Sequence, residues 1–82
     1  MMMAHAKTVI IPTSDLPVAA DAMFWLVDHV GRLLTLVERD FLSADLRYYG
    51  LDPNVTIWVS RPDDHPDMVR FTEQRGEAAV RV

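Results

Sequence analysis

The chain has 82 residues, of which 50% are apolar and 24% are charged, and its formal net charge is −4. Because such a chain is too hydrophobic for disorder and too short for two cores, we predict one folded domain over residues 1–82, with residues 1–6 flexible. The eight Lys and Arg residues are spread along the chain. Their spacing argues against direct nucleic-acid binding, which needs a clustered basic patch.

The chain contains no cysteine, which excludes disulfides, thiolate metal sites and thiol catalysis. This composition fits a reducing compartment, so we expect a cytoplasmic protein. Residues 1–7 lack the features of a secretory signal peptide. The apolar residues 16–37 include Asp21, Asp28 and Arg32, and each charge near a bilayer centre costs about 2.5–3.5 kcal/mol. We therefore predict no membrane span.

The N-terminal third predicts a strand followed by a long helix. Residues 8–11 are a β-branched run that ends at Pro12. Ser14 or Asp15 is expected to cap a helix over residues 16–42. The apolar arc of this helix covers roughly 200°, whereas an ordinary surface helix has a stripe of about 100°.

This helix is also long for the domain. It would span about 40 Å, whereas a compact domain of this size is roughly 30 Å across. Two outcomes remain open. Either the helix breaks near Gly31 or Ser43, or it packs on a second copy of the chain.

The rest of the chain predicts a short second helix and a strand meander. Ser43 is expected to cap the helix over residues 44–49. The pattern then changes to the two-residue alternation of strands. Three strands are predicted, at residues 55–59, 68–72 and 78–82, with a polar loop at 61–67 and a tight turn at 74–76.

The predicted fold class is α+β. We expect two layers: a four-stranded, mainly antiparallel sheet with one long helix and a short second helix on one face, in the order β-α-α-β-β-β. The strand residues expected to face the helix are Val9, Ile11, Val55, Ile57, Val59, Val69, Phe71, Val80 and Val82. The open face would carry Trp58, Met68, Arg70 and Arg81.

The densest set of possible metal ligands is the segment Asp63-Asp64-His65-Pro66-Asp67. Its spacing matches no known metal loop, so we interpret it as a solvated loop, with metal binding as the alternative. His5, His29 and His65 share no local spacing, and no nucleophile accompanies them. We therefore predict no catalytic residue, metal, cofactor or small-molecule ligand.

The partner-binding candidates are Trp25, Arg32, Trp58, Met68, Arg70 and Arg81. Trp25 falls at the edge of the predicted helix, where it either lies flat over the helix or anchors an interface. Trp58 falls on the open sheet face. There it is either covered by Tyr48, Tyr49 or the N-terminal segment, or it belongs to a contact site.

These features favour a non-enzymatic domain that acts by occupying the surface of a partner protein. An acidic chain suits basic protein partners. A narrower hypothesis, from size and charge, is a small phage- or plasmid-encoded inhibitor of the anti-CRISPR kind. The alternative is a self-assembling structural or accessory subunit that forms a homodimer through the long helix or the open sheet face. A small enzyme or metal-binding protein is the lesser alternative.

Overall fold

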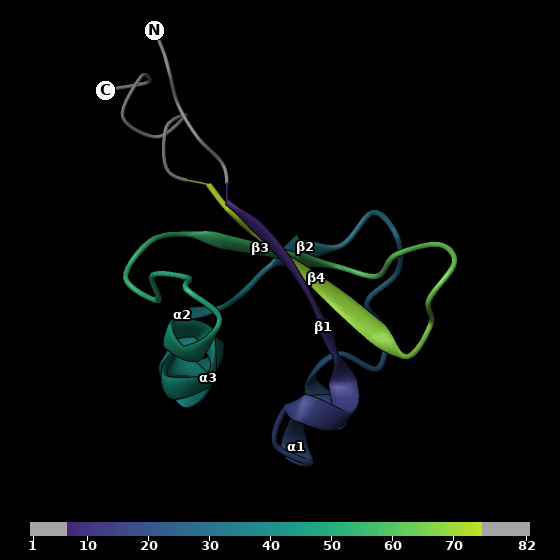
Figure 1. The fold of residues 1–82 in the computed structure, drawn as a ribbon, viewed down its shortest axis with the longest axis horizontal. Coiled ribbons are helices and arrows are strands. Elements are labelled where there is room, and N and C mark those ends of the chain that lie inside the picture. Colours follow the sequence, from purple (N-terminus) through teal and green to yellow (C-terminus); the bar gives the residue numbers. More distant parts are fainter. Residues whose placement is uncertain (1–6, 75–82) are drawn as a thin grey trace, which may run out of the picture.

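The computed structural model describes residues 7–74 and has two layers, a four-stranded antiparallel sheet and a layer of short helices on one of its faces (Figure 1). The strands are β1 (Thr8–Pro12), β2 (Arg32–Leu33), β3 (Ile57–Ser60) and β4 (Met68–Glu73). The sheet order is β1-β4-β3-β2, with every neighbouring pair antiparallel. The helices are the 3-10 turn η1 (Thr13–Asp15), α1 (Ala19–Met23), α2 (Leu36–Phe41) and α3 (Ser43–Tyr48). The predicted α+β class and antiparallel sheet are confirmed.

The core lies between the two layers and follows the alternation of the strands. β4 buries every second residue, and the sheet residues Ile11, Ile57, Val59, Val69 and Phe71 are fully buried, as the alternation predicts. Val9 and Val55 pack against the core as partly buried residues. The helical layer contributes Phe24, whose ring meets Phe71 edge to face at 5.8 Å. The final predicted strand, with Ala78, Val80 and Val82, lies outside the described residues.

The predicted long helix over residues 16–42 is wrong. Residues 13–15 form η1 rather than a helix cap, and α1 begins at Ala19 without a side-chain cap from Ser14 or Asp15. No helix in the described part of the chain is long and apolar enough to cross a membrane. Within residues 7–74 the order is β-α-β-α-α-β-β, whereas the order predicted for this part of the chain is β-α-α-β-β, since β2 lies inside the segment predicted as helix.

α1 ends at Met23, and two local interactions then oppose a return to helix before Arg32. The Asp28 carboxylate accepts hydrogen bonds from the backbone N–H groups of Val30 and Gly31, which competes with helical pairing. Gly31 has φ = 81°, a left-handed conformation that suits glycine. The chain therefore turns before Arg32 and enters β2.

A new helix then starts at Thr35. Its hydroxyl accepts from the Glu38 N–H at 3.1 Å, and the Glu38 carboxylate accepts from the Thr35 N–H at 2.9 Å, which completes a capping box. α3 follows directly with Leu42 as its N-cap and no side-chain cap, so the predicted Ser43 cap is wrong, although the short helix itself is confirmed. The broad apolar arc thus faces several directions: some members are buried, whereas Leu26 and Val37 are exposed.

Candidate protein-binding groove

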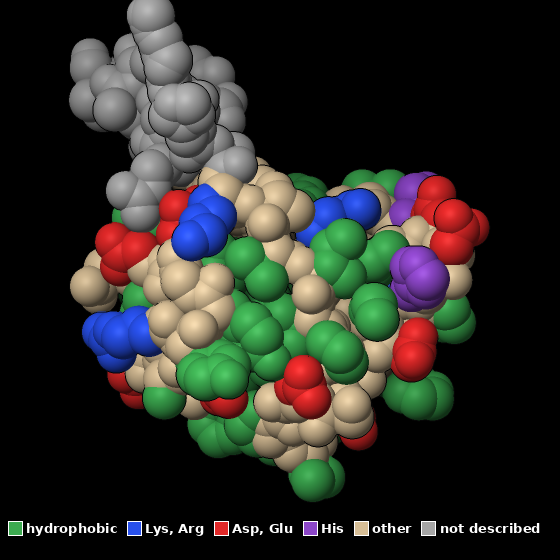
Figure 2. All heavy atoms as spheres, viewed as in Figure 1, with side chains coloured by type: hydrophobic (Ala, Val, Ile, Leu, Met, Phe, Trp, Pro, Cys, Tyr) green, Lys and Arg blue, Asp and Glu red, His purple; other side chains and the backbone are tan. Residues whose placement is uncertain are grey.

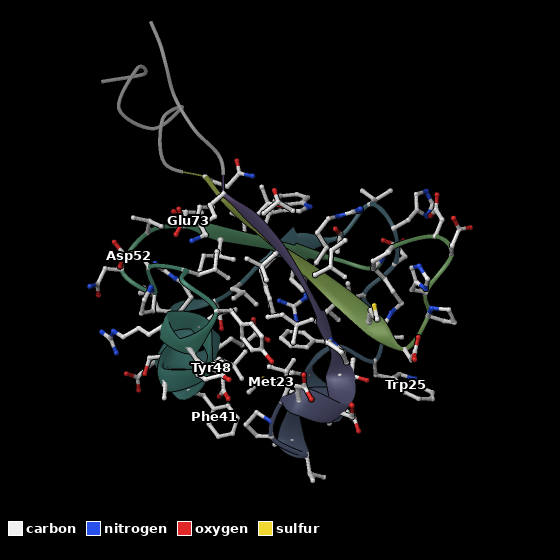
Figure 3. All side chains as sticks on the ribbon, viewed as in Figure 1. Met23, Trp25, Phe41, Tyr48, Asp52 and Glu73 are labelled. Carbon is white, nitrogen blue, oxygen red and sulfur yellow. The ribbon has the colours of Figure 1, made fainter. Side chains whose placement is uncertain are left out.

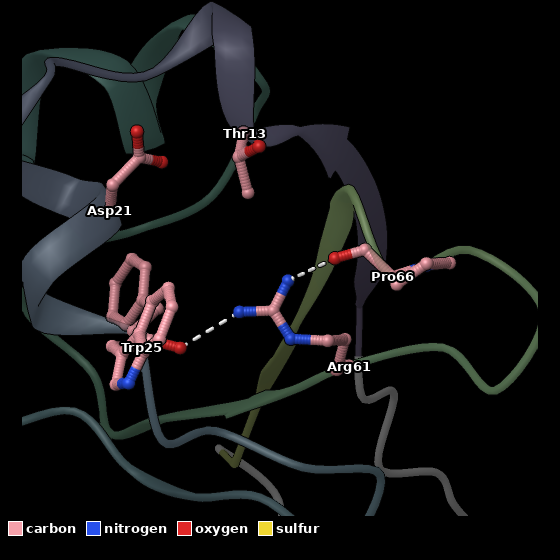
Figure 4. Close-up of a pocket in the computed structure, with 6 residues that line it drawn as sticks. Thr13, Asp21, Trp25, Arg61 and Pro66 are labelled. Carbon is pink, nitrogen blue, oxygen red and sulfur yellow. Dashed lines mark hydrogen bonds between the residues drawn. The ribbon is translucent and has the colours of Figure 1, made fainter.

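A groove opens where the end of α1 meets the loop between β3 and β4 (Figure 4). It consists of two adjoining cavities of about 410 and 170 Å³, which share Arg61 and Pro66 in their linings. The larger cavity is lined by Thr13, Asp21, Phe24, Trp25, Arg61 and Pro66. The smaller one is lined by Asp28, His29, Arg61, Pro62, Asp63 and Pro66. We name the two together the Trp25 groove.

Arg61 holds the two walls of the groove together. Its Nη2 donates to the Phe24 carbonyl at 2.8 Å and its Nε donates to the Val27 carbonyl at 3.0 Å, so it binds the end of α1. Its Nη1 donates to the Pro66 carbonyl in the facing loop (Figure 4). The groove is therefore fixed by a guanidinium that bonds to main-chain carbonyls from segments far apart in the sequence.

Trp25 lines the groove with an exposed side chain, and Leu26, the next residue in the chain, is also exposed. Their exposed fractions are 79% and 89%, although the preceding residue, Phe24, is completely buried. α1 ends at Met23, and the Phe24 N–H makes the last bond to this helix, at Ala20 O. The turn that follows directs Trp25 outward, on the side of α1 away from α2 and α3 (Figure 3). The sequence left two hypotheses for Trp25, a side chain lying flat over the helix edge and an interface anchor. Its exposure favours the interface anchor.

The groove has a negative rim. Asp21, Asp28 and Asp63 line it with exposed side chains, against the single guanidinium of Arg61. The hydrogen bond from the Gly31 N–H lowers the pKa of the Asp28 carboxyl, so this carboxylate stays ionised further into the acid range than an ordinary aspartate. Figure 2 shows acidic and histidine side chains gathered at this end of the molecule. The rim therefore favours a positively charged ligand surface.

Arg32, another of the predicted partner-binding residues, makes hydrogen bonds within the chain. Both of its Nη atoms bond to the Glu38 carboxylate, at 2.8 and 2.9 Å, and Nη2 also donates to the Met23 carbonyl at 3.0 Å. Its guanidinium lies 5.9 Å from the centre of the Phe24 ring. Arg32 therefore anchors the end of α1, next to the groove, without lining it.

The structure places Trp58, Met68 and Arg70 together on the open face of the sheet, opposite the helices. All three are half-buried. The Trp58 indole N–H donates to the Val30 carbonyl at 2.8 Å, and Arg70 donates to the Ser60 hydroxyl at 3.0 Å. This face is separate from the Trp25 groove. Arg81 lies outside the described residues.

A second exposed apolar cluster lies on α2 and α3. Leu36, Val37, Phe41 and Tyr48 have exposed side chains there. Phe41 and Tyr48 lie on the other side of α1 from Trp25 (Figure 3). Leu36 also lines a separate cavity, but this cluster contains no tryptophan.

From the segment 63–67, Asp63 and Pro66 line the groove. Among residues 7–74, no group of three or more histidine or acidic side chains is placed to hold a metal ion. The sequence identified Trp25 but missed Arg61 and Asp21. Arg61 gave no signal because its partners are carbonyls, which every residue carries. Asp21 has no acidic neighbour in the sequence, and it becomes part of an acidic rim only when the β3–β4 loop folds against α1.

No sequence relative assists the assignment of this groove, which depends on the chain's own residues. The comparisons with family models, with curated proteins and with solved structures found no match for the chain.

Proposed function

We propose that the protein is a binding domain that docks a segment of another protein in the Trp25 groove. The observation that carries the proposal is the high exposure of Trp25, which lines a cavity of about 410 Å³ and is followed by the exposed Leu26. Large exposed aromatic side chains beside a cavity are typical of binding hot spots. A solvated tryptophan loses apolar hydration when a partner covers it, which favours association.

The charge of the rim specifies the partner chemistry. Three carboxylates surround the groove against one guanidinium, whose Nε, Nη1 and Nη2 atoms all donate to carbonyls. We therefore propose a partner segment with an apolar side chain that enters the cavity, flanked by Lys or Arg. These cations would meet the acidic rim and the face of Trp25, which also attracts cations. A dimer in which two grooves face each other is disfavoured because the two acidic rims repel, so we propose that the segment belongs to another protein.

The experiment has two stages. A photoreactive residue in place of Leu26 captures the partner from cells, and the same residue in place of Val37, on α2, is the matched control. Binding of the purified partner is then measured for Trp25→Ala and for Tyr48→Ala. Tyr48 is also a strongly exposed aromatic residue, at 81%, but lies away from the groove.

We expect Trp25→Ala to weaken binding about thirtyfold or more, as for a hot-spot residue, and Tyr48→Ala to have little effect. The association rate should fall as salt concentration rises, because the acidic rim attracts the partner over a distance. Equal losses for the two variants would contradict the proposal, as would binding whose rate does not respond to salt.

A second candidate function, self-assembly, is supported by strand β1. The Glu73 N–H donates to the Lys7 carbonyl, so the antiparallel pattern turns the backbone groups of Thr8 and Ile10 away from β4, toward the side of β1 that no strand within residues 7–74 covers. Ile10 is also 48% exposed. Two copies paired along β1 would form one continuous sheet. Light scattering tests this candidate: a dimer that Ile10→Lys dissociates would support it, and a strict monomer would reject it.

A further inference from the structure

A polar cavity of about 310 Å³ lies at the other end of the molecule, where α2 and α3 meet the loop that follows α3. Its lining includes two arginines, Arg39 and Arg47, together with Ser43 and Asn54. Asp40 is the one acidic residue in this lining. The charge is therefore opposite to that of the Trp25 groove: two guanidinium groups face one carboxylate.

Arg39 is held by hydrogen bonds, and its charge has no acidic partner among residues 7–74. Its Nη1 donates to the carbonyls of Pro53 and Val55, at 3.2 and 2.6 Å, which fixes the guanidinium between α2 and the loop. Its Nε is buried and has no hydrogen-bond partner. The ion pair found within residues 7–74 joins Arg32 to Glu38 and leaves Arg39 without a carboxylate. An anion in the cavity would meet a positive charge that no carboxylate among the described residues balances.

The other donors of the cavity are also available. Arg47 is exposed on α3, and its guanidinium makes no hydrogen bond to the described part of the chain. The Ser43 hydroxyl and the Asn54 side-chain amide line the same cavity. Together with Arg39, these groups surround one small space with guanidinium, hydroxyl and amide donors. Oxyanions are bound by such donor sets.

We propose that this cavity binds a small oxyanion, in the form of a phosphate or carboxylate group. Arg39 supplies the fixed charge, and Arg47 closes over the anion from α3. Ser43 and Asn54 donate to its oxygens, whereas Asp40 limits the affinity by repulsion. The site shares no residue with the Trp25 groove, so it stands independently of the proposed protein-binding function.

Nuclear magnetic resonance titration of the full chain tests this site. The probes are inorganic phosphate and, separately, acetate, each added at constant ionic strength. The signals observed are the Arg39 side-chain N–H and the backbone amides of Ser43 and Asn54. We expect saturable shifts at these positions. Tighter binding of phosphate would assign a phosphate ligand, and tighter binding of acetate would assign a carboxylate.

Three variants distinguish a specific anion-binding site from attraction by the overall charge of the protein. Arg47→Gln should weaken anion binding about tenfold or more, because one charge-assisted contact is lost. Arg39 is not substituted, because it also donates hydrogen bonds to two main-chain carbonyls and its loss could disturb the fold. Asp40→Asn should strengthen binding. Asp64→Asn makes the same change of net charge in the distant β3–β4 loop and should leave the affinity unchanged.

Three results would overturn the proposal. One is a set of shifts that grow linearly with both anions and spread over the whole protein. Another is an equal gain in affinity for Asp40→Asn and Asp64→Asn, which would reveal only a long-range charge effect. The third is an Arg47→Gln variant that binds both anions as tightly as the unaltered chain.

Discussion

The ion pair between Arg32 and Glu38 gives the sharpest stability prediction, through the substitution Glu38→Gln. The Glu38 carboxylate accepts two hydrogen bonds from Arg32 and one from the Thr35 N–H. Arg32 in turn donates to the Met23 carbonyl at the end of α1. A neutral glutamine retains the shape of the side chain but removes the charge that holds Arg32. We therefore expect a weaker link between α1, β2 and α2.

The size of the effect follows from the burial of the two partners. The Arg32 side chain is 39% exposed and the Glu38 side chain is 14% exposed. Hydrogen bonds to charged groups contribute about 1.5–3 kcal/mol, and solvent screening at the arginine reduces this contribution. We expect Glu38→Gln to lower the free energy of unfolding by about 1–2 kcal/mol at neutral pH.

The effect should depend on pH in a defined direction. The hydrogen bond from Arg32 holds the pKa of the Glu38 carboxyl below its ordinary value. A carboxyl with a lowered pKa stabilises the fold at pH values above its unfolded pKa, and this stabilisation is lost as the pH falls through the folded pKa. The difference between the two proteins should therefore be complete at neutral pH and should close in the acid range.

Urea unfolding followed by circular dichroism, at a series of pH values, measures this difference. Thr35→Ala is the matched control, because it removes the hydroxyl of the capping box and leaves the Arg32–Glu38 pair in place. Its cost, about 1 kcal/mol, should vary little with pH. The reasoning would be refuted if Glu38→Gln left the free energy of unfolding unchanged at neutral pH, or if its loss of stability persisted in acid.

Three further predictions use the same unfolding measurement. Phe24→Ala should lower the free energy of unfolding by about 3–5 kcal/mol, since its ring is completely buried. Trp25→Ala should change the free energy of unfolding by about 0.5 kcal/mol or less, because its side chain is exposed. Similar losses for the two variants would contradict the assignment of Phe24 to the core and Trp25 to the surface. Gly31→Ala should lower the free energy of unfolding more than Gly50→Ala, although both glycines have positive φ. A Cβ at Gly31 meets a main-chain carbonyl of β3, whereas a Cβ at Gly50 meets only a flexible lysine side chain. Equal losses would show that the carbonyl contact is unimportant. Arg61→Met should lower the free energy of unfolding by about 1.5–3 kcal/mol, since a charged donor to several carbonyls is lost; an unchanged value would mean that Arg61 does not hold the groove together.

The strands were predictable from the sequence because one face of the sheet is buried. Val69 and Phe71 alternate with Arg70 and Thr72, and a shift of one residue would expose the apolar pair. The same alternation of buried and exposed residues predicted β1 and the residues of β3 that face the core. What the alternation could not supply was β2, since two residues are too short for a pattern.

The helix prediction failed because periodicity carries no information about interruptions. The apolar spacing of residues 16–42 is compatible with one helix, but Asp28 and Gly31 form a turn that the spacing does not reveal. One signal was present in the sequence: Thr35 and Glu38 have the spacing of a capping box, which marks a helix start. The groove was only partly predictable. Trp25 was identified, but the contacts of Arg61 depend on tertiary structure.

The central claim, that a protein partner covers Trp25, is tested most directly by tryptophan fluorescence. In a Trp58→Phe variant, Trp25 is the one remaining tryptophan. It is 79% exposed, so its emission should resemble that of a solvated indole. The partner captured at Leu26 should shift this emission to the blue and protect it from a soluble quencher. Emission and quenching that stay unchanged while the partner binds would contradict the claim.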